Sequence, residues 1–361
     1  MTVRDKVGQL FMIGFQGTDL SGEFLDWLKE YRPGGVILFS RNLVDPFQIA
    51  RLTNALQEQA PNGPLLIAVD QEGGRVSRLP QGFTIFPPAM AVASCQSADV
   101  AYSAAEVTAK ELRAVGINMN MAPVLDVNSN PTNPIIGDRA FGQTADLVCT
   151  YGTATFQGLQ ENGVIACGKH FPGHGETATD SHEVLPVVEV SRTRLEEVEL
   201  RPFRHAIKNG LATIMSAHVL YPALDAKAPA TLSPVILTEL LQGYLAFRGL
   251  VLTDDLDMKA ILNHSSVGDA AVRSLQAGAD MLLVCHQQDH QTAAIHAVEK
   301  ALEDGVLLMN RIEASQARIS SLKERFLPPH RPVNLDTVLE VVGCRSHRDL
   351  LKKIQKVAVR S

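Results

Sequence analysis

Short apolar runs recur eight times in this sequence, and a polar, helix-like stretch follows each of them. None of the runs alternates strictly between apolar and polar residues, which is typical of parallel strands buried on both faces. The runs span residues 9–15, 35–39, 65–69, 117–122, 164–168, 212–217, 250–253 and 281–285. This repeated alternation of strand and helix predicts an α/β fold with a parallel sheet.

The stretches between the runs carry residues that begin and end helices. Asp45 followed by Pro46 favours a helix start, and Ser233 followed by Pro234 repeats the pattern. Gly278 stands ahead of the eighth run, where a helix C-terminus belongs. Eight such units in 361 residues favour a single (β/α)8 barrel of the TIM type over an open doubly wound sheet, which usually has fewer strands.

We expect the barrel to occupy residues 1–330. After Phe326 the sequence LPPHRP breaks the helical pattern, and residues 331–361 are expected to form a C-terminal helical extension and no separate domain. The helix predicted over residues 193–208 contains Pro202, so we expect a kink or a break there.

The charge and composition of the chain argue against several classes of binding partner. The net charge is −6, so the chain lacks the basic field that nucleic acid or an acidic membrane surface would require. The five cysteines are scattered without close pairs, which argues against a disulfide framework and a CxxC metal site. No cleavage site follows the short N-terminal apolar run, and no run approaches the roughly 20 residues that span a bilayer. We expect a soluble, cytoplasmic monomer that binds neither nucleic acid nor membrane.

Polar residues follow the predicted strands at the ends that would meet at one mouth of a barrel. The densest group is residues 169–182, KHFPGHGETATDSH, which combines a lysine, three histidines and two acids in a turn-rich segment. Such a segment is either a catalytic loop or a metal site. Other strand ends contribute Asp70, Asp126, His218 and Asp254.

Four motifs carry a family resemblance. They are DQEGGRVSR (70–78), IGDRAFG (136–142), KHFPGHGETATDSH (169–182) and VLTDDLDM (251–258), and in this order the chain resembles the NagZ-type β-N-acetylglucosaminidases (β-hexosaminidases) of glycoside hydrolase family 3. The match covers about residues 5–326. Members of this short type are single barrels, whereas many relatives append a domain that supplies the catalytic acid, and the residues after 326 are too few for such a domain.

The resemblance implies a retaining mechanism with Asp254 as nucleophile. Asp254 and Asp255 point to opposite faces of a strand, and periodicity alone leaves open which of them faces the mouth. Asp180 and His182 are two residues apart and would project to the same side of an extended segment, so the carboxylate could orient the imidazole as an acid/base dyad. In the resembled enzymes the matching histidine has that role. The alternative is that these residues only cap a helix or a loop.

The resemblance also implies the residues that hold the sugar. They are Asp70, Arg78, Arg139, Lys169 and His170. Carboxylates and cations suit the hydroxyl groups at the edge of a pyranose, although a buried structural pair between Arg139 and Asp70 could coexist with binding. The expected substrate is a terminal non-reducing N-acetyl-β-D-glucosaminide, in particular a muropeptide fragment from peptidoglycan recycling, and no cofactor or metal is expected.

Three other functions stay open. A metallohydrolase could use His170, His174 and His182 with an aspartate, although Lys169 beside them would repel a cation. A non-catalytic sugar-binding barrel would need no dyad. A phosphorylase of the same family could use phosphate as acceptor in place of water, because a neutral histidine would not repel it.

Overall fold

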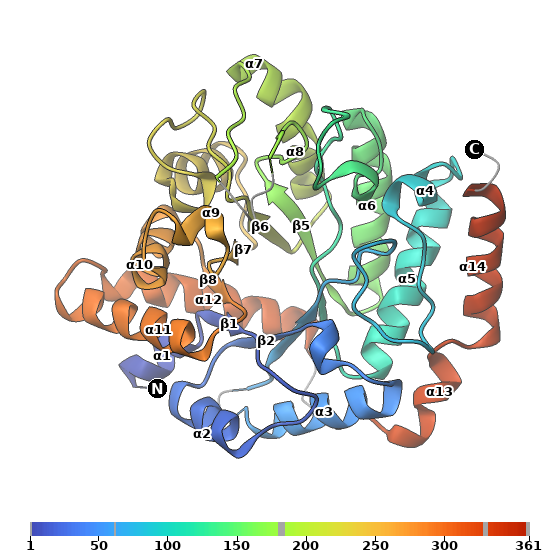
Figure 1. Ribbon diagram of the computed structural model, residues 1–361, viewed down its shortest axis with the longest axis horizontal. Helices are drawn as coiled ribbons and strands as arrows, with labels where there is room; N and C mark the ends of the chain where they lie inside the picture. The colour runs from blue at the N-terminus through green and yellow to red at the C-terminus, as the bar shows by residue number, and fades with distance from the viewer. Residues whose placement is uncertain (1, 61–62, 180–184, 328–330, 359–361) are drawn as a thin grey trace.

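The computed structural model describes residues 2–60, 63–179, 185–327 and 331–358, and its centre is a closed barrel of parallel strands (Figure 1). Neighbouring strands in sequence are neighbours in the barrel, and the last strand pairs with the first. The strands are β1 Phe11–Ile13, β2 Gly35–Leu38, β3 Leu66–Val69, β4 Met119–Asn120, β5 Ile165–Phe171, β6 Thr213–Ser216, β7 Leu250–Asp255 and β8 Met281–Val284. The predicted (β/α)8 barrel is therefore confirmed.

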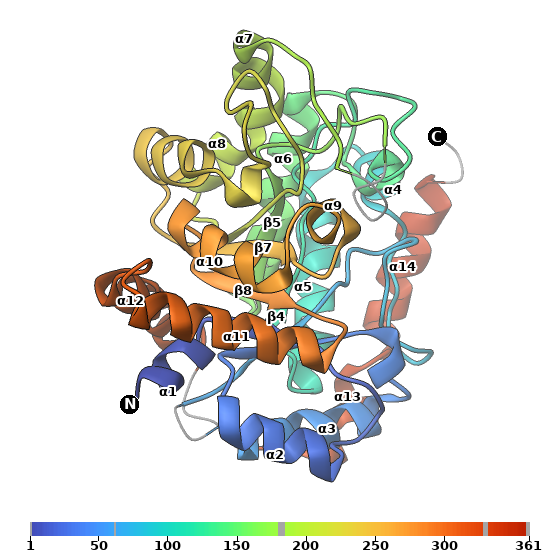
Figure 2. The same cartoon turned by 60° about the vertical axis from the view of Figure 1, so that its left-hand side comes forward.

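Helices surround the barrel (Figures 1 and 2). The α-helices are α1 Val3–Gly8, α2 Gly22–Tyr31, α3 Pro46–Glu58, α4 Ala89–Ala93, α5 Ala98–Ala114, α6 Ala145–Glu161, α7 Arg192–Arg194, α8 Leu200–Lys208, α9 Lys259–Leu262, α10 Val267–Ala277, α11 Gln288–Glu303, α12 Met309–Phe326, α13 Val338–Val341 and α14 Arg345–Ala358. The 3₁₀ turns are η1 Ser40–Asn42, η2 Gly137–Arg139, η4 Ala230–Leu232 and η6 Leu335–Thr337, and two segments are π-helical, η3 Leu195–Glu199 and η5 Val235–Tyr244.

The helix ends follow the local sequence signals. Asp45 caps α3 as predicted, because its Oδ1 accepts hydrogen bonds from the backbone amides of Phe47 at 2.8 Å and Gln48 at 2.9 Å. Gly278 ends α10 with φ at 120°, a left-handed conformation that favours glycine. No break occurs at Pro202 itself, because the chain stays helical from Arg192 to Lys208 and Pro202 lies within α8; the irregularity is the π-helical turn η3 directly before α8.

Two strands extend beyond their apolar runs, and all of the added residues except Phe171 are polar. β5 continues through Lys169 and His170, and β7 continues to Asp255. The register of each strand shifts within this added part, between Gly168 and Phe171 in β5 and between Leu252 and Asp255 in β7. Such irregularities re-aim side chains next to active sites, so the ends of β5 and β7 present polar groups at the mouth of the barrel.

The C-terminal extension consists of η6, α13 and α14 and lies against α3, α4 and α5 (Figures 1 and 2). Its buried apolar side chains are Val338, Val342 and Ile354. The predicted helical extension is thus confirmed. Among the helices of the described ranges, none combines the length and the apolar character needed to cross a bilayer.

Candidate active site

A pocket opens at the carboxyl ends of the strands and holds about 830 Å³ of empty space, part of it open to solvent. Every sequence-predicted site residue that the structure describes lines the pocket: Asp70, Arg78, Arg139, Lys169, His170 and Asp254. The two remaining predicted residues, Asp180 and His182, lie outside the described residues.

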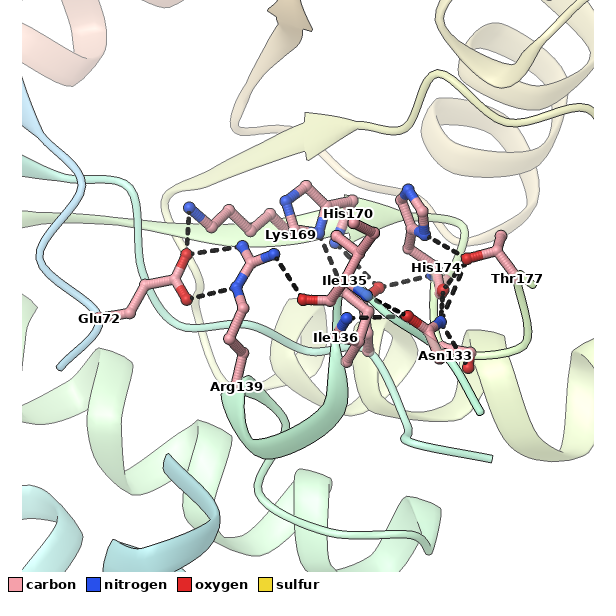
Figure 3. Close-up of polar contacts among 12 residues, drawn as sticks. Glu72, Asn133, Ile135, Ile136, Arg139, Lys169, His170, His174 and Thr177 are labelled. Atoms are coloured by element: carbon pink, nitrogen blue, oxygen red, sulfur yellow. Dashed lines mark hydrogen bonds and ion pairs between the residues drawn. The ribbon is translucent and has the colours of Figure 1, made fainter. Parts of the chain in front are cut away.

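Glu72 lies at the centre of the polar wall of this pocket. Its carboxylate accepts hydrogen bonds from Nε and Nη2 of Arg139, both at 2.8 Å, and Lys169 Nζ lies 2.7 Å from Oε1 (Figure 3). Burial opposes the ionisation of Glu72, but Lys169 and Arg139 hold its pKa well below the usual range. The structural pair expected between Arg139 and Asp70 is wrong, because the bidentate partner of Arg139 is Glu72.

Lys169 connects the two acidic residues that follow β3. Only 3% of its side chain is exposed, and Nζ also lies 2.7 Å from Asp70 Oδ1. Burial lowers the pKa of Lys169, but the negative charges of Asp70 and Glu72 outweigh this effect and raise it above the ordinary value. Two buried cations, Lys169 and Arg139, therefore balance the negative charges of two acids, Asp70 and Glu72.

Arg78 also lines the pocket, and it takes no part in the ion pairs that Lys169 and Arg139 form. Among the described residues its Nε has no hydrogen-bond partner although this atom is buried. Its backbone amide is fixed, because it donates to Gln71 Oε1 at 3.0 Å. Gln71 in turn exchanges hydrogen bonds with Asn120 of β4. Arg78 thus presents unsatisfied donors from a backbone that is held in place, as a ligand-binding residue would.

Asp126 orients His170. This fully buried carboxylate lies 2.7 Å from His170 Nδ1, and its other oxygen accepts from the backbone amides of His170 at 3.1 Å and His174 at 2.7 Å. The carboxylate favours a proton on Nδ1, which leaves Nε2 as the ring nitrogen for a ligand. The sequence placed Asp126 at a strand end but gave no sign of this role.

Asn133 joins the loop after β4 to the loop after β5. Its Nδ2 donates to the carbonyls of His174 and Gly175, both at 2.9 Å, and to Thr177 Oγ1 at 3.1 Å (Figure 3). Its Oδ1 accepts from the backbone amides of residues 135 and 136, both at 2.8 Å. The Asn133 side chain thereby fixes the first part of the loop that leads toward residues 180–184. No sequence pattern indicated this residue.

His174 belongs to the same buried group. Its Nδ1 lies 2.8 Å from Thr177 Oγ1, which donates to the His174 carbonyl and so accepts from the ring. Burial lowers the pKa of His174 to about 4, with a smaller contribution from nearby His170. His174 is therefore neutral at neutral pH and braces the loop.

Asp254 and Asp255 both line the pocket but have different surroundings. Asp255 Oδ1 accepts from the backbone amides of Asp257 and Cys285, both at 3.1 Å, and Oδ2 lies 3.2 Å from His286 Nε2. Asp255 therefore ties the end of β7 to the residues after β8. Asp254 is half-buried and accepts from the backbone amide of Asp255 at 2.8 Å. Of the two, Asp254 has the more exposed side chain.

His218, at the end of β6, supports this pair. Its Nε2 lies 2.9 Å from the Asp255 carbonyl, and Nδ1 lies 2.8 Å from Thr231 Oγ1. The ring is fully buried, and burial lowers its pKa. His218 is thus a structural residue that holds the end of β7.

The pocket also has an apolar side. Its lining residues are Ile37 of β2, Met215 of β6 and Leu283 of β8, together with Phe39, Val76, Ile135 and Met258 from segments outside the strands. A pocket with one polar and one apolar side suits a pyranose, whose ring edge carries hydroxyl groups and whose faces carry C–H bonds. Among the described residues no group of three or more histidines, cysteines or acids has the arrangement of a metal site.

The spacing of acidic residues in the sequence points to Glu72. It lies two residues after Asp70, so in an extended segment both carboxylates point to the same side. The same spacing of two residues separates Asp180 from His182.

Comparisons with known proteins identify the family to which the chain belongs. The family model of the glycosyl hydrolase family 3 N-terminal domain matches residues 2–322. Beta-hexosaminidase A of Pseudoalteromonas piscicida is 36% identical over 368 residues, which is 95% of this chain and 61% of that protein. Beta-hexosaminidase of Nitrosomonas eutropha is 41% identical over 285 residues, or 77% of this chain and 81% of the relative.

A solved structure extends the similarity to the C-terminal helices. The glycoside hydrolase family 3 β-N-acetylglucosaminidase of Paenibacillus sp. str. FPU-7 has a TM-score of 0.93 and 43% identity, covering 99% of this chain and 69% of that one. The chain thus spans about three fifths of the P. piscicida relative and about two thirds of the Paenibacillus enzyme. On the family match over residues 2–322, the chain belongs to glycoside hydrolase family 3 and contains the N-terminal domain of that family.

Proposed function

We propose that the protein is a retaining exo-β-N-acetylglucosaminidase that removes terminal non-reducing N-acetylglucosamine from β-glycosides. The observation that carries this proposal is the pocket in which Asp254 lies together with Asp70, Arg78, Arg139, Lys169 and His170. Relatives named β-hexosaminidase and β-N-acetylglucosaminidase support it.

In this proposal Asp254 is the nucleophile. Its carboxylate attacks the anomeric carbon, the bond to the leaving oxygen breaks, and a covalent glycosyl-aspartate forms. Water then attacks the same carbon from the opposite side to the aspartate, which restores the β configuration. Asp255, His286 and His218 keep the end of β7 in place during both steps.

His182, oriented by Asp180, is the acid/base. It protonates the leaving oxygen in the first step and takes a proton from water in the second. A neighbouring carboxylate would favour the imidazolium form that the first step needs. Both residues lie outside the described ranges, so this assignment rests on the spacing of the motif, and Asn133 fixes the loop that leads to them.

The sugar would be held by the polar wall. Arg78 Nε, which has no hydrogen-bond partner among the described residues, and Nε2 of His170 bind the sugar, and Asp70 accepts from sugar hydroxyls. Lys169 and Arg139 set the charge and position of Asp70 and Glu72. No metal or other cofactor takes part in this mechanism.

We further propose that the natural substrates are muropeptide fragments from peptidoglycan recycling, and that the enzyme acts in the cytoplasm as a monomer. These finer assignments rest on the resemblance of the four motifs.

The deciding assay compares the hydrolysis of an aryl N-acetyl-β-glucosaminide, the matching β-glucoside and the β-N-acetylgalactosaminide. The proposal requires the first to be hydrolysed fastest, with the β anomer appearing first by NMR. Hydrolysis of the glucoside alone, or an α anomer as first product, would overturn it. A glycosyl phosphate formed in phosphate buffer would identify a phosphorylase.

A further inference from the structure

A single buried carboxylate links the C-terminal extension to the loop after β3. Glu111 of α5 is 1% exposed. Its oxygens accept hydrogen bonds from the Thr84 amide at 2.7 Å, the Thr84 hydroxyl at 2.7 Å and the Gly343 amide at 2.9 Å, and His347 Nδ1 lies 2.8 Å away. Three separate segments of the chain therefore meet at one side chain.

The backbone of the extension also touches this loop directly. Gly343 has φ at 61°, and a Cβ added there would lie 2.1 Å from the carbonyl oxygen of Gly82. Only a glycine permits this approach. The extension thus contacts residues 82–84 through a close backbone approach and through Glu111.

Residues 82–84 belong to the loop that carries the ligand-binding residues after β3. This loop runs from Asp70 to the start of α4 and includes Glu72 and Arg78. On one side Gln71 holds the Arg78 amide, and on the other side Glu111 holds Thr84, six residues later. Thr84 is itself buried, so the hydrogen bonds to Glu111 are shielded from water.

We propose that Glu111 is a positioning residue that, with Gly343 and His347 of the extension, fixes the loop after β3 so that Arg78 points into the substrate pocket. The extension is then part of the machinery for substrate binding, although it lies outside the pocket. The proposal rests on the proposed function in one respect, the role of Arg78 as a sugar ligand.

Glu111→Gln tests the proposal, because the amide keeps the size of the side chain but turns one acceptor into a donor facing other donors. We expect KM for an aryl N-acetyl-β-glucosaminide to rise about tenfold, the order of one lost hydrogen bond to a charged group, while kcat changes less than about threefold. Thr84→Val should give a smaller rise, and Thr84→Ser should restore wild-type KM.

Asp280→Asn is the matched control. Asp280 is a fully buried carboxylate that accepts from the Val251 amide at 3.2 Å, Ser315 Oγ at 2.8 Å and Arg318 Nη1 at 2.7 Å. It precedes β8 and so lies at the end of the barrel opposite the pocket. Its replacement should lower the melting temperature and leave KM within about twofold.

Two kinetic outcomes would overturn the proposal. One is a KM that stays unchanged in Glu111→Gln and in Thr84→Val. The other is an equal rise of KM in Asp280→Asn, which would show a general effect of instability.

Amide hydrogen exchange of residues 74–84 gives an independent measurement that needs no enzymatic activity. Faster exchange there in folded Glu111→Gln or Thr84→Val is expected, and unchanged exchange in both would contradict the proposal even if the substrate assay failed.

Discussion

At the scale of single residues, the pocket depends on buried carboxylates that hold cations and rings. Glu72 holds Arg139 and Lys169, Asp126 holds His170, and Asp255 holds the residues after β8. The sequence motifs identified the residues that these carboxylates orient. They did not identify Glu72 and Asp126 as the orienting groups, because each contact joins segments that are far apart in the chain.

Replacement of Glu72 tests the charge balance of the polar wall. In Glu72→Gln the buried guanidinium of Arg139 and the ammonium of Lys169 would lose their shared anion. We expect a loss of about 3–5 kcal/mol in the free energy of unfolding, measured by urea denaturation, and a fall in kcat/KM of more than about 100-fold. The control is Asp138→Asn, which breaks the half-exposed pair with Arg75 and should cost less than about 1 kcal/mol. Equal costs in both variants would contradict the assignment.

Asp126→Asn tests the orientation of His170. The asparagine can keep its oxygen on the two backbone amides, but its Nδ2 then faces His170 Nδ1 and favours the tautomer with the proton on Nε2. We expect kcat/KM to fall about 100-fold with little change in the melting temperature, and ¹⁵N NMR of the imidazole should report the change of tautomer. Wild-type kinetics with an altered tautomer would show that His170 does not contact the substrate.

At the scale of elements, the sequence predicted the strands and helices well and their ends less well. Apolar runs identified all eight strands, because a strand buried on both faces needs apolar residues throughout. The same criterion predicted ends for β5 and β7 that are too early. Lys169 and His170 in β5, and Asp254 and Asp255 in β7, are polar because they line the pocket. The criterion could not choose between Asp254 and Asp255 either, because that depends on a register shift.

The Asn133 side chain forms a clamp between two loops, the one after β4 and the one after β5. Asn133→Asp keeps the shape but places a carboxylate against the carbonyls of His174 and Gly175. We expect a loss of about 2 kcal/mol in stability and faster amide exchange of residues 173–177. Asn54→Asp is the control, because the Asn54 side chain bonds both backbone groups of Val333, remote from these loops. Exchange that is equally slow in Asn133→Asp would refute the clamp.

At the scale of the whole molecule, the buried histidines make the fold sensitive to acid. The pKa of His174 is about 4 in the folded protein and 6.5 as the ordinary value. A depressed pKa means that its contribution to stability is complete above pH 6.5 and is lost as pH falls toward 4. The loss should approach about 3 kcal/mol for this residue. His218, whose pKa is also lowered, acts in the same direction.

His174→Asn tests this acid sensitivity, since the amide keeps a donor for Thr177 and cannot titrate. Its unfolding free energy, measured between pH 7 and pH 4, should fall less steeply than that of the wild type. Parallel pH profiles for the two proteins would show that His174 is not the titrating group.

The central claim is that Asp254 forms a covalent bond to the sugar. The most direct measurement is trapping with a slow fluorinated N-acetylglucosaminyl substrate, followed by mass spectrometry of the peptide that contains residues 251–258. We expect one added fluorinated N-acetylglucosaminyl unit on Asp254, absent in Asp254→Asn. An adduct on Asp255, or turnover of the slow substrate with no adduct on this peptide, would contradict it.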